Sequence, residues 1–330
     1  MKAVIITKPG GADVLEIREV QTPPDPVANR VRVRVRASAL NRADILQRMG
    51  RYPAPPGAPK DIPGLEFAGE VDQVGPEVRT WKPGQRVFGI TGSGAHAEYV
   101  IVPGDHLVEI PENLSWENAA AVPEVFITAH DALFTQARLT IGETLLVHAA
   151  GSGVGTAASQ LAKAAGARVI GTSRTPDKLE QARGFGFDET IAVGNDPLTI
   201  VNAIRELTGG HGVDVVLDLV GGAYLEANIR SLANKGRLFF VGTTSGAQGN
   251  LDIGTVMGKR LKLRGTVLRA RSEEEKATAT RLFARHVGPL LANGTVRPVV
   301  DKVYKLEDVA RAHERIESNQ NFGKVVLLVD

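Results

Sequence analysis

Three glycines within five residues form the feature of this sequence best suited to chemistry. Gly151, Gly153 and Gly155 follow the apolar run Thr144–Val147 and precede an alanine-rich helical stretch. Small residues at a helix N-terminus let backbone N–H groups approach a pyrophosphate, and the helix dipole favours its negative charge. Two of the three glycines of a full G-x-G-x-x-G fingerprint are missing, so an ordinary structural turn is the alternative. We predict a nucleotide-binding turn.

The residues after the next strand bear on which nucleotide is bound. The run Arg168–Gly171 leads to Ser173 and Arg174, and Lys178 follows one helical turn later. An acidic residue at this place would bind the ribose 2′-hydroxyl and repel a 2′-phosphate. A hydroxyl and two cations suit the phosphate instead. The sequence therefore predicts NADPH rather than NADH as the cofactor.

Composition limits the remaining function classes. With 330 residues, two domains are expected, and 39 Lys+Arg against 37 Asp+Glu give a net charge of +2. This balance argues against nucleic acid as the main partner and against a membrane surface. Neither a long apolar segment nor a signal-peptide pattern occurs, so we expect a cytoplasmic protein. The absence of cysteine excludes thiolate metal sites, and the histidines lack ligand spacing, so no metal is expected.

The first third of the chain has the pattern of a β domain. Residues 30–36 alternate arginine with valine, which predicts a strand whose basic face is solvated rather than bound to nucleic acid. Further strands are expected at Glu66–Val74 and Arg86–Ile90, and Arg51–Pro63 reads as a proline-rich loop. Short strands joined by Gly/Pro turns indicate a barrel-like domain.

Helices and strands then alternate, which indicates an α/β fold with a doubly wound parallel sheet and right-handed crossovers. Asp214 and Asp218, in one of these strands, could contact cofactor or pair locally. Near the C-terminus we expect a strand at Val296–Val300, a helix at Leu306–Glu317 and a strand at Lys324–Val329. The last strand is expected to rejoin the first domain, which leaves the Rossmann domain inserted in a discontinuous one.

Motifs scattered over almost the whole length carry a family likeness. They are Ala37–Asp44, Gly64–Glu66, Ala121–Glu124, Ser152–Gln160, Asp218–Gly222 and Asn321–Val326. The chain resembles the zinc-free quinone oxidoreductases of the medium-chain dehydrogenase/reductase superfamily, most closely the p53-inducible quinone oxidoreductase type. The resemblance implies a GroES-like β-barrel catalytic domain (1–123 plus 268–330) and an inserted Rossmann domain (124–267). It also implies bound NADPH and a homodimer formed through the edge strand Lys262–Thr266.

The same resemblance predicts chemistry without a metal. Zinc alcohol dehydrogenases of the superfamily carry a cysteine where this chain has Asn41 and a histidine where it has Leu65. The substrate must therefore accept hydride without a Lewis acid, as a quinone or an enone does. Asn41 and Tyr52 are the candidates for polarising or placing its carbonyl. Alternatively, Asn41 stabilises a turn, Tyr52 packs in its loop, and solvent supplies the proton.

The resemblance also assigns cofactor contacts. Ser152, Gly153, Val154 and Gly155 would cradle the pyrophosphate, and Thr128 would meet the nicotinamide carboxamide. The remaining predicted contacts are Gly242, Thr243, Leu268, Arg269, Asn321 and Lys324, although Arg269 and Lys324 could be plain surface charges. Relatives place a tyrosine near the adenine-phosphate pocket where this chain has Gly194, which would weaken discrimination between the two cofactors.

Three functions fit these observations. The first is an NADPH-dependent quinone reductase. The second is an enone or enoyl-thioester reductase of the same fold. The third is a non-catalytic NADPH-binding or structural protein, against which the Ser152–Gly155 turn and the basic residues near Ser173 argue.

Overall fold

The computed structural model describes residues 1–329, and the chain divides into two compact units. Unit 1 comprises Met1–Ile127 together with the chain from Leu268 onward, and unit 2 comprises Thr128–Val267. Unit 2 is thus an insertion in the sequence of unit 1. Each unit has its own apolar core, built around valines of strand Arg30–Ala39 in unit 1 and around Leu146, Ile170 and Val216 in unit 2.

Unit 1 is mainly a seven-stranded sheet in the order β14-β15-β3-β4-β5-β7, with β6 also paired to β3. Its strands are β1 (Lys2–Ile6), β2 (Leu15–Glu19), β3 (Arg30–Ala39), β4 (Glu66–Val74), β5 (Arg86–Ile90), β6 (Tyr99–Pro103), β7 (Leu107–Glu109), β14 (Val300–Lys305) and β15 (Lys324–Leu328). Its helices are α1 (Arg42–Arg48), α2 (Trp116–Ala120), α9 (Glu273–Ala292) and α10 (Val309–Glu317), and α3 (Pro123–His130) begins in it. β1 and β2 form a separate antiparallel pair.

The C-terminal strand joins the sheet of the N-terminal segment, as expected. β15 lies antiparallel to β3, with Val326 opposite Ala39. The expected strand at Val296–Val300 is wrong, because the observed β14 begins at Val300. Pro298, which has no N–H to donate, lies inside the expected span. Leu306–Asp308 is a 3₁₀ turn, so the α-helix begins only at Val309.

The arginine face of β3 is neutralised by acidic residues. Arg32 pairs with Asp72 at 2.6 Å and Arg36 with Glu70 at 2.7 Å, both acids being on β4. Arg30 pairs with Glu273 at 2.8 Å. These pairs favour the interpretation of a solvated, ion-paired face.

Unit 2 is a six-stranded, fully parallel sheet in the order β10-β9-β8-β11-β12-β13. The strands are β8 (Thr144–Val147), β9 (Arg168–Ser173), β10 (Glu189–Ala192), β11 (Val213–Asp218), β12 (Leu232–Phe240) and β13 (Lys262–Gly265). The helices are α4 (Gly153–Ala164), α5 (Pro176–Ala182), α6 (Thr199–Leu207), α7 (Leu225–Ser231) and α8 (Ile253–Lys259), preceded by a π-helical turn at Asp131–Gln136.

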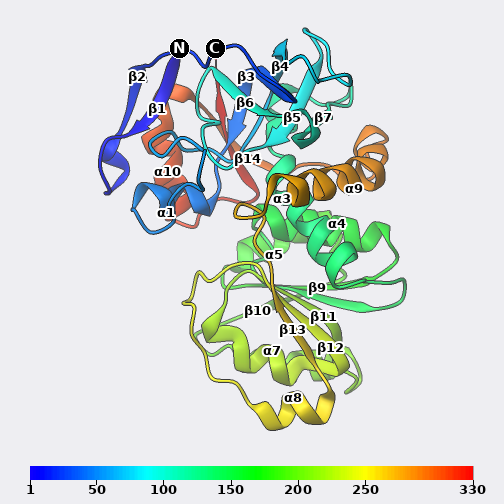
Figure 1. The fold of residues 1–330 in the computed structure, drawn as a ribbon. Helices are drawn as coiled ribbons and strands as arrows, with labels where there is room; N and C mark the ends of the chain where they lie inside the picture. Colours follow the sequence, from blue (N-terminus) through cyan, green and yellow to red (C-terminus); the bar gives the residue numbers. More distant parts are fainter. Residues whose placement is uncertain (330) are drawn as a thin grey trace. The chain divides into compact units, whose positions relative to one another are not determined.

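The strand order of unit 2 is that of a doubly wound nucleotide-binding fold. Numbered along the chain, it reads 3-2-1-4-5-6, and it reverses between β8 and β11. Figure 1 shows α4 and α5 on one side of this sheet and α7 on the other. Ligands of such sheets bind outside the carboxyl ends of the strands at the reversal. The expected Rossmann architecture is confirmed.

Candidate active site

Asn41 lies in the tight connection between β3 and α1. It is the N-cap of α1, and its backbone N–H donates to Asp44 Oδ2 at 2.7 Å, the return contact expected three residues after a cap. The other Asp44 oxygen accepts from the N–H of Gly64 at 3.0 Å. Gly64 has φ +105°, and a Cβ there would lie 2.6 Å from the backbone N of His96. Only glycine therefore fits the chain just before β4.

Lys324, at the start of β15, joins Asn41 to Glu66, the first residue of β4. Its Nζ donates to the Leu40 carbonyl at 2.6 Å and to Asn41 Oδ1 at 2.7 Å, and it lies 2.7 Å from Glu66 Oε1. Asn41 Nδ2 donates to the same Glu66 oxygen at 2.8 Å. Lys324 is 4 % exposed and Glu66 is 0 % exposed, so neither is a surface charge. Both ends of the Asn41 amide are engaged within the protein.

Glu124 is the second carboxyl group of this region. Its backbone N–H, in the first turn of α3, donates to Glu66 Oε2 at 2.8 Å. Its side chain is only partly buried. Burial, followed by repulsion from Glu66, raises the pKa of Glu124 to about 8. A group with such a pKa near neutrality is suited to holding and giving a proton.

Tyr52 and Arg269 form a stacked pair. The Arg269 guanidinium lies 4.8 Å from the centre of the Tyr52 ring and donates to the Tyr52 carbonyl at 3.1 Å. It also donates to the Gly92 carbonyl at 2.8 Å and to the Gln47 side chain. Arg269 is 4 % exposed, so the surface-charge interpretation does not hold. Burial raises the pKa of the Tyr52 phenol, which keeps it protonated and able to donate.

Lys276 is a further buried cation of unit 1. It lies in the first turn of α9 and is 7 % exposed. Burial lowers its pKa, while the carboxylates of Glu124 and Glu273 raise it. The structure thus gathers Asn41, Tyr52, Arg269 and Lys324 in unit 1 beside two charged residues, Glu124 and Lys276, to which the sequence gave no role.

In unit 2, the turn between β8 and α4 has the geometry expected where a helix N-terminus binds an anion. Ser152 is the N-cap of α4, and its Oγ accepts from the Gly155 N–H at 3.0 Å. A Cβ on Gly155 would lie 2.6 Å from the Ala149 carbonyl, so α4 approaches this turn too closely for a side chain. The first N–H groups of a helix have no partner within the helix. Those of Gly153 and Val154 are the ones suited to a pyrophosphate.

The basic residues predicted to bind a 2′-phosphate lie at the carboxyl end of β9. Ser173 ends the strand, and its Oγ accepts from the Thr175 N–H at 3.1 Å. Arg174 is exposed and Lys178 is partly buried. Tyr224, which the sequence analysis did not single out, lies close enough to Arg174 for that cation to lower its pKa, although burial raises the pKa overall.

Loops after β11 and β12 complete this edge of the sheet. Asp218 Oδ1 accepts from the N–H groups of Val220 and Gly221 at 2.7 and 2.9 Å, so this carboxylate is paired locally. A Cβ on Gly242 would lie 2.7 Å from the Leu219 carbonyl, so the Gly242–Thr243 segment lies directly against the β11 loop. Apart from Thr128 on α3, the predicted contacts of unit 2 thus lie at the carboxyl ends of three strands, β8, β9 and β12.

A buried histidine fastens these strand ends. His148 follows β8 and is 0 % exposed. Its two ring nitrogens lie 2.8 Å from Thr172 Oγ1 and 2.6 Å from Asn228 Oδ1, and Asn228 donates to Asp218 at 2.9 Å. Burial lowers the pKa of His148, so the neutral ring is favoured. His148 is therefore a buried histidine whose two ring nitrogens both have partners within the protein.

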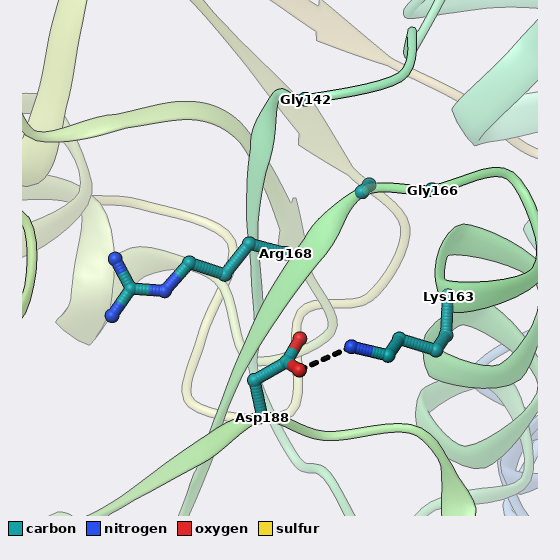
Figure 2. A pocket seen from close by; sticks show the side chains of 6 residues that line it. Gly142, Lys163, Gly166, Arg168 and Asp188 are labelled. Atoms are coloured by element: carbon teal, nitrogen blue, oxygen red, sulfur yellow. Dashed lines mark hydrogen bonds and ion pairs between the residues drawn. The ribbon is translucent and has the colours of Figure 1, made fainter.

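The other edge of the same sheet bears a shallow hollow of about 260 Å³. Figure 2 shows its Lys163 side chain directed at Asp188, with Arg168, Gly142 and Gly166 around it. Arg168 is paired with Glu189 at 2.7 Å. These residues stand at the amino ends of β8 and β9, and both cations are already paired with acids. This hollow therefore does not fit the nucleotide.

Three predicted cofactor contacts, Thr128, Leu268 and Asn321, remain to be located in the structure. Thr128 lies within α3, and Leu268 is buried in unit 1. Asn321 donates from its side chain to the Gly323 carbonyl at 2.9 Å. Over residues 1–329 no group of three His, Cys, Asp or Glu side chains could hold a metal ion. No helix in that range is long and apolar enough to cross a membrane.

Comparison with known proteins agrees with this architecture. Residues 27–112 match the alcohol dehydrogenase GroES-like domain and residues 153–285 match the zinc-binding dehydrogenase family. A quinone oxidoreductase of Pseudomonas aeruginosa is 37% identical over 97% of both chains. The NADPH complex of Escherichia coli quinone oxidoreductase has a TM-score of 0.87 at 32% identity, covering both chains fully. An NAD-dependent alcohol dehydrogenase structure has a TM-score of 0.88 at 37% identity, again with full coverage.

A GroES-like segment with an inserted Rossmann sheet defines the class, the oxidoreductases of the medium-chain dehydrogenase/reductase superfamily. Within it, this chain belongs to the quinone oxidoreductase family. Membership of the p53-inducible type stays a prediction.

Proposed function

We propose that the chain is a zinc-independent, NADPH-dependent reductase of quinones or related conjugated carbonyls. The observation that carries the proposal is the cluster in which Lys324 joins Asn41 to Glu66. Zinc needs anionic or imidazole ligands, and here a lysine ammonium already neutralises the Glu66 carboxylate. The chain has no cysteine, so thiolate ligands are not available for this site. The donor set does not fit zinc, in spite of the name of the matching family.

The cofactor preference rests on unit 2. Ser152, Gly153, Val154 and Gly155 would hold the pyrophosphate, and Ser173, Arg174 and Lys178 would hold the 2′-phosphate. The exposed guanidinium of Arg174 and the N-terminus of α4 support this assignment. Gly242 and Thr243 would follow the same ligand. The NADPH-bound bacterial relative is in accord, while the relative named NAD-dependent makes a direct comparison of the two cofactors necessary.

NADPH would supply the hydride, and residues of unit 1 would place the acceptor. Among residues 1–329 the Tyr52 hydroxyl has no hydrogen-bond partner, so it is available to donate to a substrate carbonyl. Asn41 has both amide groups engaged, so we assign it the task of fixing the floor of the site beside Lys324. Arg269 fixes the Tyr52 loop through its backbone contacts. Thr128, Leu268 and Asn321 remain proposed contacts of the nicotinamide end.

We also propose that the GroES-like domain comprises residues 1–123 plus 268–330 and the Rossmann domain residues 124–267. A homodimer formed through β13 is a further proposal. β13 is an edge strand, and on the helix before it Ile253 and Met257 are 64% and 72% exposed. An unpaired edge flanked by apolar side chains is suited to pairing with a second copy. The cytoplasm remains the expected compartment.

Steady-state NADPH oxidation against a panel of quinones, enones and enoyl thioesters tests the function. We expect turnover with at least one quinone, unchanged after treatment with a zinc chelator, and a lower KM for NADPH than for NADH. Loss of activity on chelation would contradict the zinc-independent mechanism. Turnover confined to enoyl thioesters would favour the second reductase activity, and absence of turnover with every acceptor would contradict a reductase.

A further inference from the structure

We propose that Glu124 donates the proton that the reduced acceptor requires, a step that rests on the reductase function proposed above. From the sequence, the possible sources of this proton were the Tyr52 hydroxyl and solvent. Four features of the site support Glu124: its lack of an ion-pair partner, its partial exposure, the groups that surround it and its position on α3.

The carboxyl group of Glu124 lacks the partner that would hold it ionised. An ammonium has three N–H donors, and those of Lys324 go to Leu40, Asn41 and Glu66. Three of the five N–H donors of Arg269 go to neutral oxygens of Gly92, Tyr52 and Gln47. Over residues 1–329 the Glu124 carboxyl has neither a hydrogen bond nor an ion pair. Glu66 is paired with Lys324 and Asn41, whereas nothing comparable favours ionisation of Glu124, which therefore keeps its proton.

Solvent exposure also distinguishes Glu124 from Glu66. Glu66 is 0 % exposed, with one oxygen bound to Lys324 and Asn41 and the other to the Glu124 N–H. Glu124 is partly exposed, so of the two only Glu124 can meet a ligand and recover a proton from water. It also precedes Thr128 by four residues on α3, so the two side chains share a face of that helix. Thr128 is the residue proposed to meet the nicotinamide.

The charged groups that face Glu124 come from five segments. Glu66 on β4 and Asp44 on α1 disfavour its ionisation, while Lys324 on β15 and Lys276 on α9 favour it. Tyr52 and Arg269 also interact with it electrostatically. Burial is the largest influence and outweighs the two lysines, so the pKa lies near 8. Tyr52 and Glu124 thus provide two donors, one for binding the carbonyl and one for protonating it.

The step balances without a further reactant. Bound NADPH would supply a hydride, that is two electrons and one hydrogen, so an oxygen of the quinone would gain negative charge. The Glu124 O–H bond breaks as the proton passes to that oxygen, which completes the hydroquinone. The resulting Glu124 carboxylate takes a proton from water before the next turnover. An enone follows the same course, with the proton passing to the enolate.

The test compares Glu124→Gln with Glu274→Gln in NADPH-dependent quinone reduction across pH 6–9.5. Both residues are first-turn glutamates, but Glu274 is exposed on α9 and serves as the matched control. For the parent protein we expect kcat to be steady below pH 7 and to fall as the pH rises through about 8. Glu124→Gln should lower kcat by on the order of 10²-fold, leave the KM for NADPH unchanged and remove this pH dependence. Glu274→Gln should match the parent.

A ¹³C-carboxyl NMR titration gives a readout independent of turnover. The parent should show a glutamate signal titrating near pH 8 that is absent in Glu124→Gln and present in Glu274→Gln. If Glu124→Gln does not fold, Glu124→Asp is used, and it should retain part of the activity and the same profile. Two results would overturn the acid role of Glu124 and leave the reductase function standing. One is an active parent protein whose pH profile is unchanged in Glu124→Gln, and the other is the absence of a glutamate signal that titrates near pH 8. If the parent protein shows no turnover, both the acid role of Glu124 and the proposed reductase function are overturned.

Discussion

The two regions that carry the proposed site are built in opposite ways. At the carboxyl edge of the unit 2 sheet, the proposed ligand contacts are the backbone N–H groups of Gly153 and Val154 and the exposed side chain of Arg174. In unit 1, the proposed chemistry falls to the buried side chains of Glu66 and Lys324 and to the partly buried Glu124. The first region needs small residues and a helix end. The second needs charges that compensate one another without water, so each of its members is expected to be less replaceable.

The largest effect should come from breaking the buried pair in unit 1. Lys324→Met leaves the Glu66 carboxylate buried without its cation, and removing one partner of a buried pair costs about 3–5 kcal/mol. Urea unfolding should show this loss for Lys324→Met. The double variant Lys324→Met/Glu66→Gln should recover part of it, because it removes the stranded charge. A loss below about 1 kcal/mol would show that the pair is no more important than a surface ion pair.

The difference between the regions also explains what the sequence could predict. The Ser152 turn, Ser173 and Arg174 lie within one continuous βαβ segment, so spacing alone indicated their arrangement. Lys324 and Asn41 are 283 positions apart, and their contact depends on the pairing of β15 with β3. The family motifs contained Asn41, Glu66, Glu124 and Lys324. Only the folded chain shows that Lys324 has no donor left for Glu124.

Features of the fold that depend on local sequence patterns were predictable, and features that depend on contacts between distant segments were not. The alternation of helices and strands indicated a doubly wound parallel sheet, which the structure confirms. The C-terminal strands depend on local sheet geometry, and Pro298 lies inside the strand that was misplaced. Surface charge was a reasonable alternative for Arg269 and Lys324, because long cations are seldom buried unless they are paired. Their partners come from distant segments, which spacing does not show.

A smaller effect should appear in the pH dependence of stability. The pKa of Glu124 is raised in the folded protein from 4.5 to about 8, so folding favours its protonated form. The stability that this proton contributes is present in full below about pH 4.5 and is lost as the pH rises through about 8. Relative to Glu124→Gln, the parent should lose about 2 kcal/mol between pH 5 and pH 8, allowing for partial exposure of the carboxyl.

Urea unfolding of both proteins at several pH values measures this difference, and Glu274→Gln again provides the control. A constant difference across the range would show that Glu124 has an ordinary pKa. That result would place Glu124 with the exposed carboxylates and weaken the contrast between the two regions.

The smallest effect should come from the open region. Arg174→Ala removes one exposed cation without disturbing the turn, so we expect the Kd for NADPH to rise about tenfold and the Kd for NADH to stay nearly constant. Arg183→Ala, also exposed in unit 2, is the control and should change neither. Fluorescence titration at low and high salt measures both constants, and the NADPH effect should shrink as salt screens the phosphate. If Arg174→Ala raises the Kd for NADPH and for NADH equally, Arg174 does not bind the 2′-phosphate. Any selectivity for NADPH would then have to come from Ser173 and Lys178, the other two side chains proposed to hold the phosphate.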